Sequence, residues 1–154
     1  MRVVLDCNVL VSAARVDGTC RALLDGVVRR HDVVLSRPIL AEYVTVAERP
    51  RQAPYRDALQ AVIAEIVRLA VIVEPVDAVY GLRDPDDEVY LATAEAGGAV
   101  LITGNTRDFT ESRYGTVEVL TPRAFLDRTT QTNRPFFACF SSIAAGRQLN
   151  PNLP

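Results

Sequence analysis

Residues 3–8 read Val3-Val4-Leu5-Asp6-Cys7-Asn8, a short apolar run that stops at a carboxylate. Consecutive apolar residues suit a strand that is buried on both faces, because a strand with one exposed face would alternate apolar and polar residues. A carboxylate directly after such a strand stands where open parallel sheets bind their ligands. Residues 8–14 then favour a helix. The stretch predicts the start of an α/β domain with a polar site at Asp6.

The same alternation of short apolar runs and amphipathic segments continues along most of the chain. Helical segments repeat apolar residues three and four positions apart, whereas strand segments are brief continuous runs. Such alternation indicates a parallel sheet with helices on both faces. We expect further strands at residues 33–35, 71–73, 99–102 and 117–120, and helices at residues 19–30, 36–47, 54–69, 88–96 and 121–127.

Several positions predict where these helices begin and end. Thr19 and Ser36 are expected N-caps, because a hydroxyl can accept a hydrogen bond from the first helical turn. Pro38 suits the first turn of the helix after Ser36. Gly97 and Gly98 are expected to stop the helix before them, because glycine is favoured just past a helix end.

Size and charge indicate one globular domain that is not basic. The chain has 154 residues, of which 49% are hydrophobic and 23% charged, and its formal net charge is −2. These values are ordinary for a globular domain. Proteins that bind nucleic acid through bulk charge are usually basic. Any nucleic-acid binding here is therefore expected to use a local patch or a metal site.

The sequence also limits the location and the kinds of site. No apolar stretch approaches the roughly 20 residues of a membrane helix, and Asp6 interrupts the region where a signal peptide would be apolar. We therefore expect a cytoplasmic protein. The three cysteines, Cys7, Cys20 and Cys139, lack metal-ligand spacing, and an odd number does not suggest a disulfide framework. The single histidine, His31, gives little support to His-based zinc sites or Ser-His-Asp chemistry.

Polar residues gather at the predicted carboxyl edge of the sheet. Asp6 follows the first strand, Thr103 and Asn105 follow the fourth, and the acidic turn at residues 84–87 begins the helix that leads to the fourth strand. If the first and fourth strands are neighbours, these groups converge. Clustered carboxylates repel one another, and oxygen ligands suit Mg²⁺ or Mn²⁺. Such an ion polarises phosphate and lowers the pKa of bound water, which suits phosphodiester hydrolysis.

Each acid also has a simpler structural explanation. Asp6 could cap a helix, and the turn at residues 84–87 could only complement a helix dipole. Glu42 lies within a predicted helix, where glutamate is usually solvated. Asp108 could cap a short turn. Taken one at a time, these residues leave both explanations open.

Four stretches, in order, resemble the sequence motifs of PIN domains. They are VLDCNVLVSA (residues 4–13), LSRPILAEY (35–43), DPDDEVYLATA (84–94) and LITGNTRDF (101–109), and VLTPRAFL (119–126) is similar to the family's closing strand and helix. The resemblance covers about residues 1–127. Any one motif is weak, but four at family spacing are specific. The branch it most resembles is the VapC-like toxin of bacterial type II toxin–antitoxin pairs.

The resemblance implies a PIN-like three-layer α/β/α fold with a four- or five-stranded parallel sheet. It implies a Mg²⁺- or Mn²⁺-dependent endoribonuclease that cleaves single-stranded or structured RNA, with a small antitoxin protein as partner. Homodimer formation is also expected from the family.

The resemblance also assigns roles to individual residues. Asp6, Glu42 and Asp87 would be the metal-binding acids, with Asp84 close by and Asp108 or Asn105 completing the site. Asn8 and Thr103 would orient ligands and waters around the metal. Candidate RNA-binding residues, which lie beside the motifs, are Arg37, Arg83 and Arg107.

Two departures from the family pattern keep an alternative open. Cys7 replaces the usual Thr, and Asn105 stands where many members carry a fourth Asp. Fewer charges should weaken metal binding, so a PIN-fold binding module with a degraded metal site is one alternative. A PIN nuclease in RNA processing, without a toxin role, is another.

Other α/β enzymes with an Asp after the first strand fit less well. A haloacid-dehalogenase-like phosphatase would have a second Asp two residues after Asp6, where this chain has Asn8. A receiver domain would have a Lys near its last strands, and this chain contains no lysine.

The predicted domain boundary divides residues 1–128 from a C-terminal extension at residues 129–154. Its segment Pro135-Phe136-Phe137-Ala138-Cys139-Phe140 is too apolar for a free tail. We expect the extension to pack on the domain or to contact a partner, with Phe136 and Phe137 as a candidate dimer contact.

Overall fold

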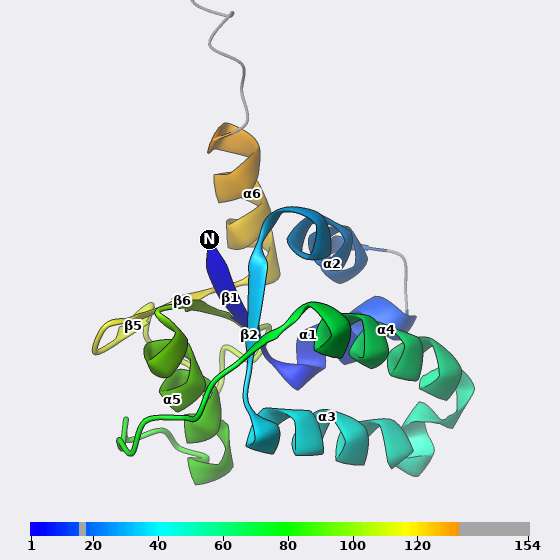
Figure 1. The fold of residues 1–154 in the computed structure, drawn as a ribbon, viewed down its shortest axis with the longest axis horizontal. Helices are drawn as coiled ribbons and strands as arrows, with labels where there is room; N and C mark the ends of the chain where they lie inside the picture. The colour runs from blue at the N-terminus through cyan, green and yellow to red at the C-terminus, as the bar shows by residue number, and fades with distance from the viewer. Residues whose placement is uncertain (16–17, 133–154) are drawn as a thin grey trace, which may run out of the picture.

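The computed structural model of the chain describes residues 1–15 and 18–132. Strands and helices alternate, as the sequence predicts (Figure 1). The strands are β1 (Arg2–Leu5), β2 (Asp32–Leu35), β3 (Val71–Ile72), β4 (Val100–Ile102), β5 (Arg113–Tyr114) and β6 (Val117–Leu120). The α-helices are α1 (Cys7–Arg15), α2 (Thr19–Arg30), α3 (Arg37–Glu48), α4 (Arg56–Leu69), α5 (Glu88–Gly97) and α6 (Pro122–Thr132), and two 3-10 helices are η1 (Pro50–Tyr55) and η2 (Pro85–Asp87).

The strands form one sheet in the order β3-β2-β1-β4-β6-β5. The first five strands in that order pair in parallel, and β5 pairs antiparallel with β6. The expectation that the first and fourth predicted strands are neighbours is confirmed, because β1 pairs with β4 and Leu5 lies opposite Ile102. The residues that follow these two strands therefore meet at one edge of the sheet.

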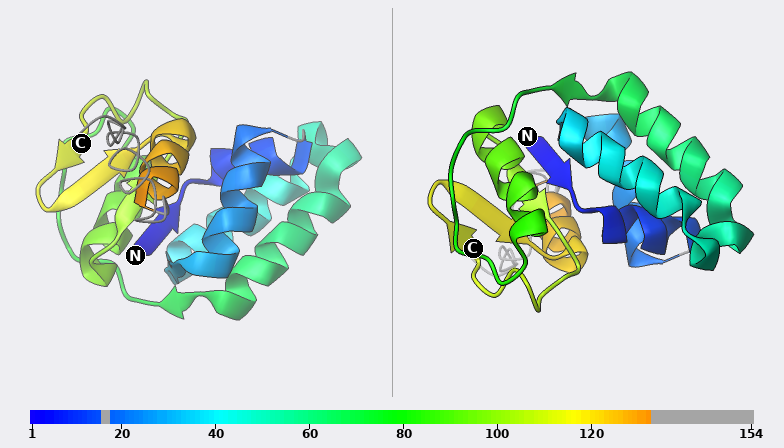
Figure 2. Two further views of the ribbon diagram at one scale, coloured as in Figure 1. Left: turned by 90° about the horizontal axis from the view of Figure 1, so that it is seen from above. Right: turned by 90° about the horizontal axis from the view of Figure 1, so that it is seen from below.

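Helices cover both faces of the sheet, which confirms the three-layer α/β/α prediction. Figure 1 shows α5 on one side of β1 and β2, with α1, α2 and α4 on the other. In Figure 2 the chain between β3 and η2 runs along the outer side of α5, where the backbone N–H of Val76 donates to the carbonyl of Ala92. This segment leads the chain back to the carboxyl edge, where η2 and α5 begin.

The core explains why β1 is apolar at consecutive positions. Val3, Val4 and Leu5 are completely buried, because β1 lies between β2 and β4 and has helices above and below it. The core continues through β2 and β4 and includes the large side chains of Tyr43 and Phe125. Burial of this apolar surface is the main stabilising contribution to the fold.

Three local predictions differ from the structure. Gly18, not Thr19, is the N-cap of α2, and Thr19 is the first residue of that helix. The helix predicted from Pro54 begins as the 3-10 helix η1 and becomes an α-helix only at Arg56. Strand β5 was not predicted, because two residues without an apolar run carry no strand signal. It pairs with β6 across a turn in which Gly115 has a φ of 55°.

Gly98 ends α5, whereas Gly97, which was also expected to stop the helix, is its last helical residue. Gly98 adopts the left-handed conformation, with a φ of 58°, and its N–H donates to the carbonyl of Glu95, as expected for glycine past a helix end. Gly97 lies against β2, and a Cβ atom there would stand 2.5 Å from Cγ1 of Val34. The absence of a side chain at Gly97 therefore lets α5 pack closely on the sheet.

The C-terminal helix is longer than predicted. Helix α6 continues to Thr132, so the first four residues of the predicted extension at 129–154 belong to this helix. The apolar segment at residues 135–140, including the candidate dimer contact, lies outside the described residues. Within the described part of the chain, no helix is both long and apolar enough to cross a membrane.

Candidate active site

Asp6 lies at the carboxyl end of β1 and is only 3% exposed. Its Oδ1 accepts a hydrogen bond of 3.1 Å from the backbone N–H of Asn8. Its Oδ2 accepts bonds of 2.6 Å from Nδ2 of Asn8 and 2.5 Å from Oγ1 of Thr103. Burial raises the pKa of Asp6, and the bonds from Thr103 and Asn8 partly oppose this rise. The carboxylate is held in one orientation by donors from both neighbouring strand ends.

Asn8 and Thr103 connect the ends of β1 and β4. Oδ1 of Asn8 accepts a 3.1 Å bond from the backbone N–H of Gly104, while its Nδ2 donates to Asp6. Thr103 is 2% exposed, and its Oγ1 accepts a 2.9 Å bond from the backbone N–H of Asn105. Each side chain therefore donates to Asp6 and accepts from the loop after β4.

Glu42 approaches Asp6 from the neighbouring helix. It lies on α3, which follows β2, the strand next to β1. Sγ of Cys7, the first residue of α1, donates to Oε1 of Glu42 at 3.2 Å. Burial and the negative charges of Asp6 and Glu42 raise the pKa of the Cys7 thiol, so the thiol remains protonated. A protonated thiol here can act as a weak donor to the carboxylate.

Asp87 lies among the other predicted acids. It ends η2 at the start of α5 and is partly buried. Burial, the larger cause, and nearby negative charges together raise the pKa of Asp87 to about 7. Those charges belong to Asp6, Asp84, Asp108 and Glu42. The other acids predicted from the sequence therefore all act electrostatically on Asp87.

Asn105 lies between two of these carboxylates. Its Nδ2 donates to Oδ2 of Asp108 at 2.6 Å and to Oδ2 of Asp87 at 3.4 Å. Asp84 is more peripheral: it is exposed, and its Oδ1 accepts a 3.1 Å bond from the backbone N–H of Asp86 at the start of η2. Asn105 thus offers an uncharged donor at a place where another carboxylate would add repulsion.

Two buried tyrosines beneath Asp6 were missed by the sequence analysis. The hydroxyl of Tyr43 donates to the carbonyl of Leu5, and the hydroxyl of Tyr90 accepts a 3.3 Å bond from the backbone N–H of Cys7. Burial raises the pKa of both tyrosines. They hold the backbone on either side of Asp6. A possible signal was their position, since Tyr43 follows Glu42 and Tyr90 lies one helical turn after Asp87.

A buried polar contact connects α3, which carries Glu42, with α5, which begins directly after Asp87. Oγ1 of Thr93 on α5 lies 2.8 Å from Oγ of Ser36. Ser36 occupies the N-cap position of α3, as predicted, but its hydroxyl makes no capping hydrogen bond to the first turn. Neither side chain is exposed. An unpaired buried hydroxyl would be destabilising, so this contact favours one arrangement of α3 against α5 and thereby of Glu42 against Asp87.

The arginines predicted to bind RNA remain available for a partner. Arg37 begins α3, Arg83 precedes Asp84, and Arg107 precedes Asp108, and all three are exposed. None of the three forms an ion pair or side-chain hydrogen bond with the part of the chain that the structure describes. They differ in this from Arg21, Arg56, Arg68, Arg123 and Arg128, which pair with carboxylates.

The donor chemistry of the site fits a hard divalent cation. Within residues 1–15 and 18–132, no three side chains of His, Cys, Asp or Glu form a ready-made metal-binding group, so the predicted ligand set remains a prediction. Burial raises the pKa of Asp87, and the negative charges of the neighbouring carboxylates raise it further. A bound cation would remove this repulsion, and oxygen ligands are those preferred by Mg²⁺ and Mn²⁺.

Comparisons with known proteins agree with the resemblance to PIN domains and with the fold. A sequence profile described as a PIN domain matches residues 2–107. The structure is similar to VapBC2 from Rickettsia felis bound to a promoter DNA fragment, with a TM-score of 0.56, 18% identity, and coverage of 79% of this chain and 98% of that chain.

Two further structures are similar at the level of the fold. VapBC-1 from nontypeable Haemophilus influenzae has a TM-score of 0.54 and 16% identity, with coverage of 80% of this chain and 99% of that chain. FitAcB from Neisseria gonorrhoeae has a TM-score of 0.54 and 23% identity, with coverage of 79% and 98%. A comparison with curated proteins finds no match.

Proposed function

Because the chain belongs to the PIN-domain family, we propose that it is a metal-dependent endoribonuclease and the toxin of a toxin–antitoxin pair. The observation that carries the proposal is the buried carboxylate of Asp6, oriented by Asn8 and Thr103 and facing the negative field of further acids. A purely structural Asp would not need such neighbours, because clustered acids destabilise a fold unless a cation offsets their repulsion.

Asp6, Glu42 and Asp87 are the proposed metal ligands. Mg²⁺ or Mn²⁺ bound there would stabilise charge on a phosphodiester and lower the pKa of a coordinated water. Asn8 and Thr103 keep the Asp6 oxygens oriented toward the site, and Asp108 and Asp84 add negative charge at its border. Asn105 completes the set by positioning Asp108 and Asp87 through its amide.

RNA is the proposed substrate, held by exposed arginines around the carboxylates. Arg37, Arg83 and Arg107 can contact the phosphate backbone, because guanidinium groups bind phosphate well. Single-stranded or looped RNA suits an edge built from side chains, since bases in an RNA duplex are difficult to reach. The net charge of −2 makes this local positive charge the main attraction for RNA.

The proposed partner is a small antitoxin protein that holds the nuclease inactive. Support comes from the fold, since the similar structures named above are VapBC and FitAB-type complexes. A homodimer in the cytoplasm is the proposed assembly. Co-expression with the product of a neighbouring small gene, followed by size-exclusion chromatography with light scattering, would measure both associations; a chain that stays monomeric and alone would contradict them.

Cleavage is expected to require a divalent metal. Labelled single-stranded RNA incubated with the full chain should be cut with Mn²⁺ or Mg²⁺ and left intact with EDTA, because the acids would otherwise repel the phosphate. Gel analysis of a panel of RNA sequences gives the measurement. Restoring Mn²⁺ after EDTA treatment should restore cutting. Equal cleavage with and without EDTA would rule out the metal-dependent assignment.

Removing the positive charges is expected to weaken RNA binding without altering the fold. Arg107→Gln should lower RNA affinity several-fold at low salt and reduce the slope of log affinity against log salt by about 0.7, the value for one contact with single-stranded nucleic acid. Arg21→Gln is the matched control, because Arg21 already pairs with Asp25 at 3.6 Å. Fluorescence anisotropy at several salt concentrations would measure both variants. An unchanged slope for Arg107→Gln would remove this residue from the RNA-binding surface.

A second candidate function is a PIN-fold binding module without catalysis. The observation that favours it is the amide of Asn105, which already donates to Asp87 and Asp108 and adds no charge for a metal. Isothermal titration with Mn²⁺ separates the two functions. Stoichiometric binding that Glu42→Gln abolishes would support the nuclease, whereas no binding by folded protein would support the module.

A further inference from the structure

A cavity of about 580 Å³ lies between α2 and α6, away from the carboxylate edge. It is lined by His31, the residue directly before β2, and by residues along the facing sides of α2 and α6. The carboxylates stand at the carboxyl ends of the strands, whereas His31 stands at the amino end. The cavity therefore belongs to a different end of the sheet from the proposed nuclease site. Its volume is within the range of small-molecule sites, roughly 300–1,000 Å³.

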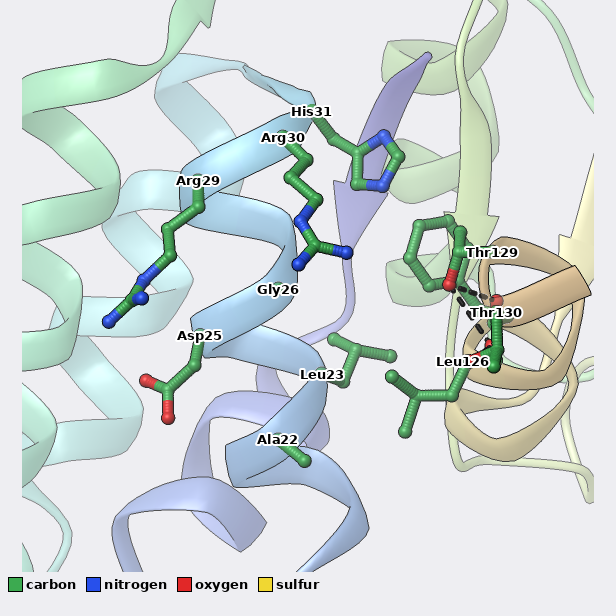
Figure 3. Close-up of a pocket in the computed structure, with 11 residues that line it drawn as sticks. Ala22, Leu23, Asp25, Gly26, Arg29, Arg30, His31, Leu126, Thr129 and Thr130 are labelled. Atoms are coloured by element: carbon green, nitrogen blue, oxygen red, sulfur yellow. Dashed lines mark hydrogen bonds between the residues drawn. The ribbon is translucent and has the colours of Figure 1, made fainter. Parts of the chain in front are cut away.

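One wall of the cavity is apolar and left open by a glycine. Ala22 on α2 and Leu126 on α6 face this space (Figure 3). The lining also includes Leu23 and Phe125, whose side chains are buried beneath it. Gly26 also lines the cavity, in the middle of α2, where an added Cβ atom would meet no atom within 4 Å. Glycine is among the least favourable residues inside a helix. No close packing requires it here, unlike at Gly97, so Gly26 leaves space that any other residue would fill.

Positive and polar groups surround the opposite part of the cavity. In Figure 3 the guanidinium of Arg30 extends into the space between α2 and α6, whereas Asp25 and Arg29 point away from α6. Arg30 has no ion pair or hydrogen bond with the part of the chain that the structure describes. The Asp25 carboxylate is paired with Arg21 at 3.6 Å. The positive charge of Arg30 is therefore uncompensated beside an apolar wall.

His31 adds a second polar group without a partner. Its Nδ1 is buried and has no hydrogen-bond partner, and its ring packs edge-on against Phe125 with the centroids 5.2 Å apart. Burial lowers the pKa of His31, and the positive charges of the N-terminus and of Arg30 lower it further. The hydroxyls of Thr129 and Thr130 bond to carbonyls within α6. Two positive charges, those of the N-terminus and Arg30, therefore lie near His31, and the carboxylate of Asp32 opposes them.

We propose that this cavity binds a small amphiphilic anion, a molecule with an apolar ring or chain and one carboxylate or phosphate group. Arg30 holds the anionic group beside His31, and Ala22 and Leu126 contact the apolar body above the buried side chains of Leu23 and Phe125. Neither half of the site would be enough alone, since an exposed arginine binds anions weakly and an apolar wall does not select charge. The site is independent of the proposed nuclease activity.

Amide shifts of the full chain in solution test the proposal, with phenylacetate and phenyl phosphate as probes. Both should cause saturable shifts at Gly26 and His31 with a Kd below about 1 mM. Phenylacetamide has the same ring without the charge, and it should bind at least about tenfold more weakly, a difference of about 1.4 kcal/mol. The tighter of the two anions identifies the preferred head group. No saturable shift at Gly26 with either anion would overturn the proposal.

Two variants locate the binding. Gly26→Leu fills the cavity, and Arg30→Gln removes the charge; each should weaken phenylacetate binding at least about tenfold. Arg21→Gln on the same helix is the matched control and should leave the affinity unchanged. Because open space surrounds Gly26, Gly26→Leu should not lower the unfolding temperature. If it does, the affinity of Arg30→Gln alone tests the proposal. Unchanged affinity in Arg30→Gln, or shifts centred on Val62 in the groove between α2 and α4, would overturn the proposal.

Discussion

Replacement of Asp6 by Asn is expected to lower RNA cleavage by about 100- to 1,000-fold or more, on the scale of removing one preorganised electrostatic group. The substitution keeps the size of the side chain but removes the charge that Asn8 and Thr103 orient. An amide would also place N–H groups where the carboxylate accepts hydrogen bonds, so a metal ligand and its orientation are lost together. Single-turnover cleavage with Mn²⁺ in excess measures the effect.

Stability should change little in this variant, because two contributions oppose each other. Burial disfavours the Asp6 charge, as its raised pKa shows, whereas the lost hydrogen bonds were favourable. Thermal unfolding should therefore show a folded protein. Asp77→Asn, which changes an exposed loop acid, is the control and should cleave like wild type. Wild-type cleavage by folded Asp6→Asn would refute the nuclease assignment.

Replacement of Asp87 by Asn is expected to lower cleavage at least about 100-fold and, in the opposite direction, to stabilise the metal-free protein. The pKa of Asp87 is raised to about 7, because the folded state buries its charge beside other acids. Folding therefore favours the protonated form. In wild type the free energy of unfolding should fall as pH rises from about 4, where an unfolded Asp ionises, to about 7.

An Asn at this position has no charge, so this part of the pH dependence should disappear. At pH 8 in EDTA, Asp87→Asn should be more stable than wild type by roughly 1–2 kcal/mol, a value reduced for solvent screening of a partly exposed group. For a chain of this size that corresponds to about 2–4 °C per kcal/mol. Added Mn²⁺ should raise the unfolding temperature of wild type and not of the variant.

Thermal unfolding at pH 5 and pH 8, each with EDTA and with Mn²⁺, gives the comparison. The two proteins should be close in stability at pH 5 and separate at pH 8. Asp77→Asn again serves as the control, because it changes an acid outside the cluster. A variant that is less stable than wild type at pH 8 in EDTA would mean that Asp87 is held by favourable contacts and not by a frustrated cluster of acids.

The local sequence determined the secondary structure wherever a segment keeps one pattern of apolar residues along its length: a continuous run for a buried strand, or a repeat of three and four positions for a helix. Val3-Val4-Leu5 predicted β1 because burial on both faces demands apolar residues at every position, and the five parallel strands are all anticipated. The positions of Asp6 and Thr103 beyond their strands also followed, since chain direction alone places them at the carboxyl edge. What remained open was whether β1 and β4 are neighbours, because strand order depends on contacts between distant segments.

Only the tertiary structure decided which ordinary residues support the site. No role was predicted from the sequence for Tyr43 and Tyr90. Their hydroxyls hold the backbone around Asp6 because folding brings α3 and α5 next to the end of β1. Strand β5 exists through pairing with β6, and has no apolar run of its own.

The glycines also divide into those whose role the sequence could predict and those whose role depends on the folded structure. Gly98 ends α5 through its own backbone conformation, which sequence could predict. Gly97 is needed for the approach of Val34, and Gly26 opens a cavity between helices that are distant in sequence. Local preferences act within a few residues along the chain, whereas close packing, cavities and shared electrostatic fields arise from residues that meet only after folding. The sequence by itself therefore determined the helices and strands and the candidate acidic residues. Folding decided which residues hold Asp6 in place, how the charges of the acids combine at Asp87, and where the cavity between α2 and α6 opens.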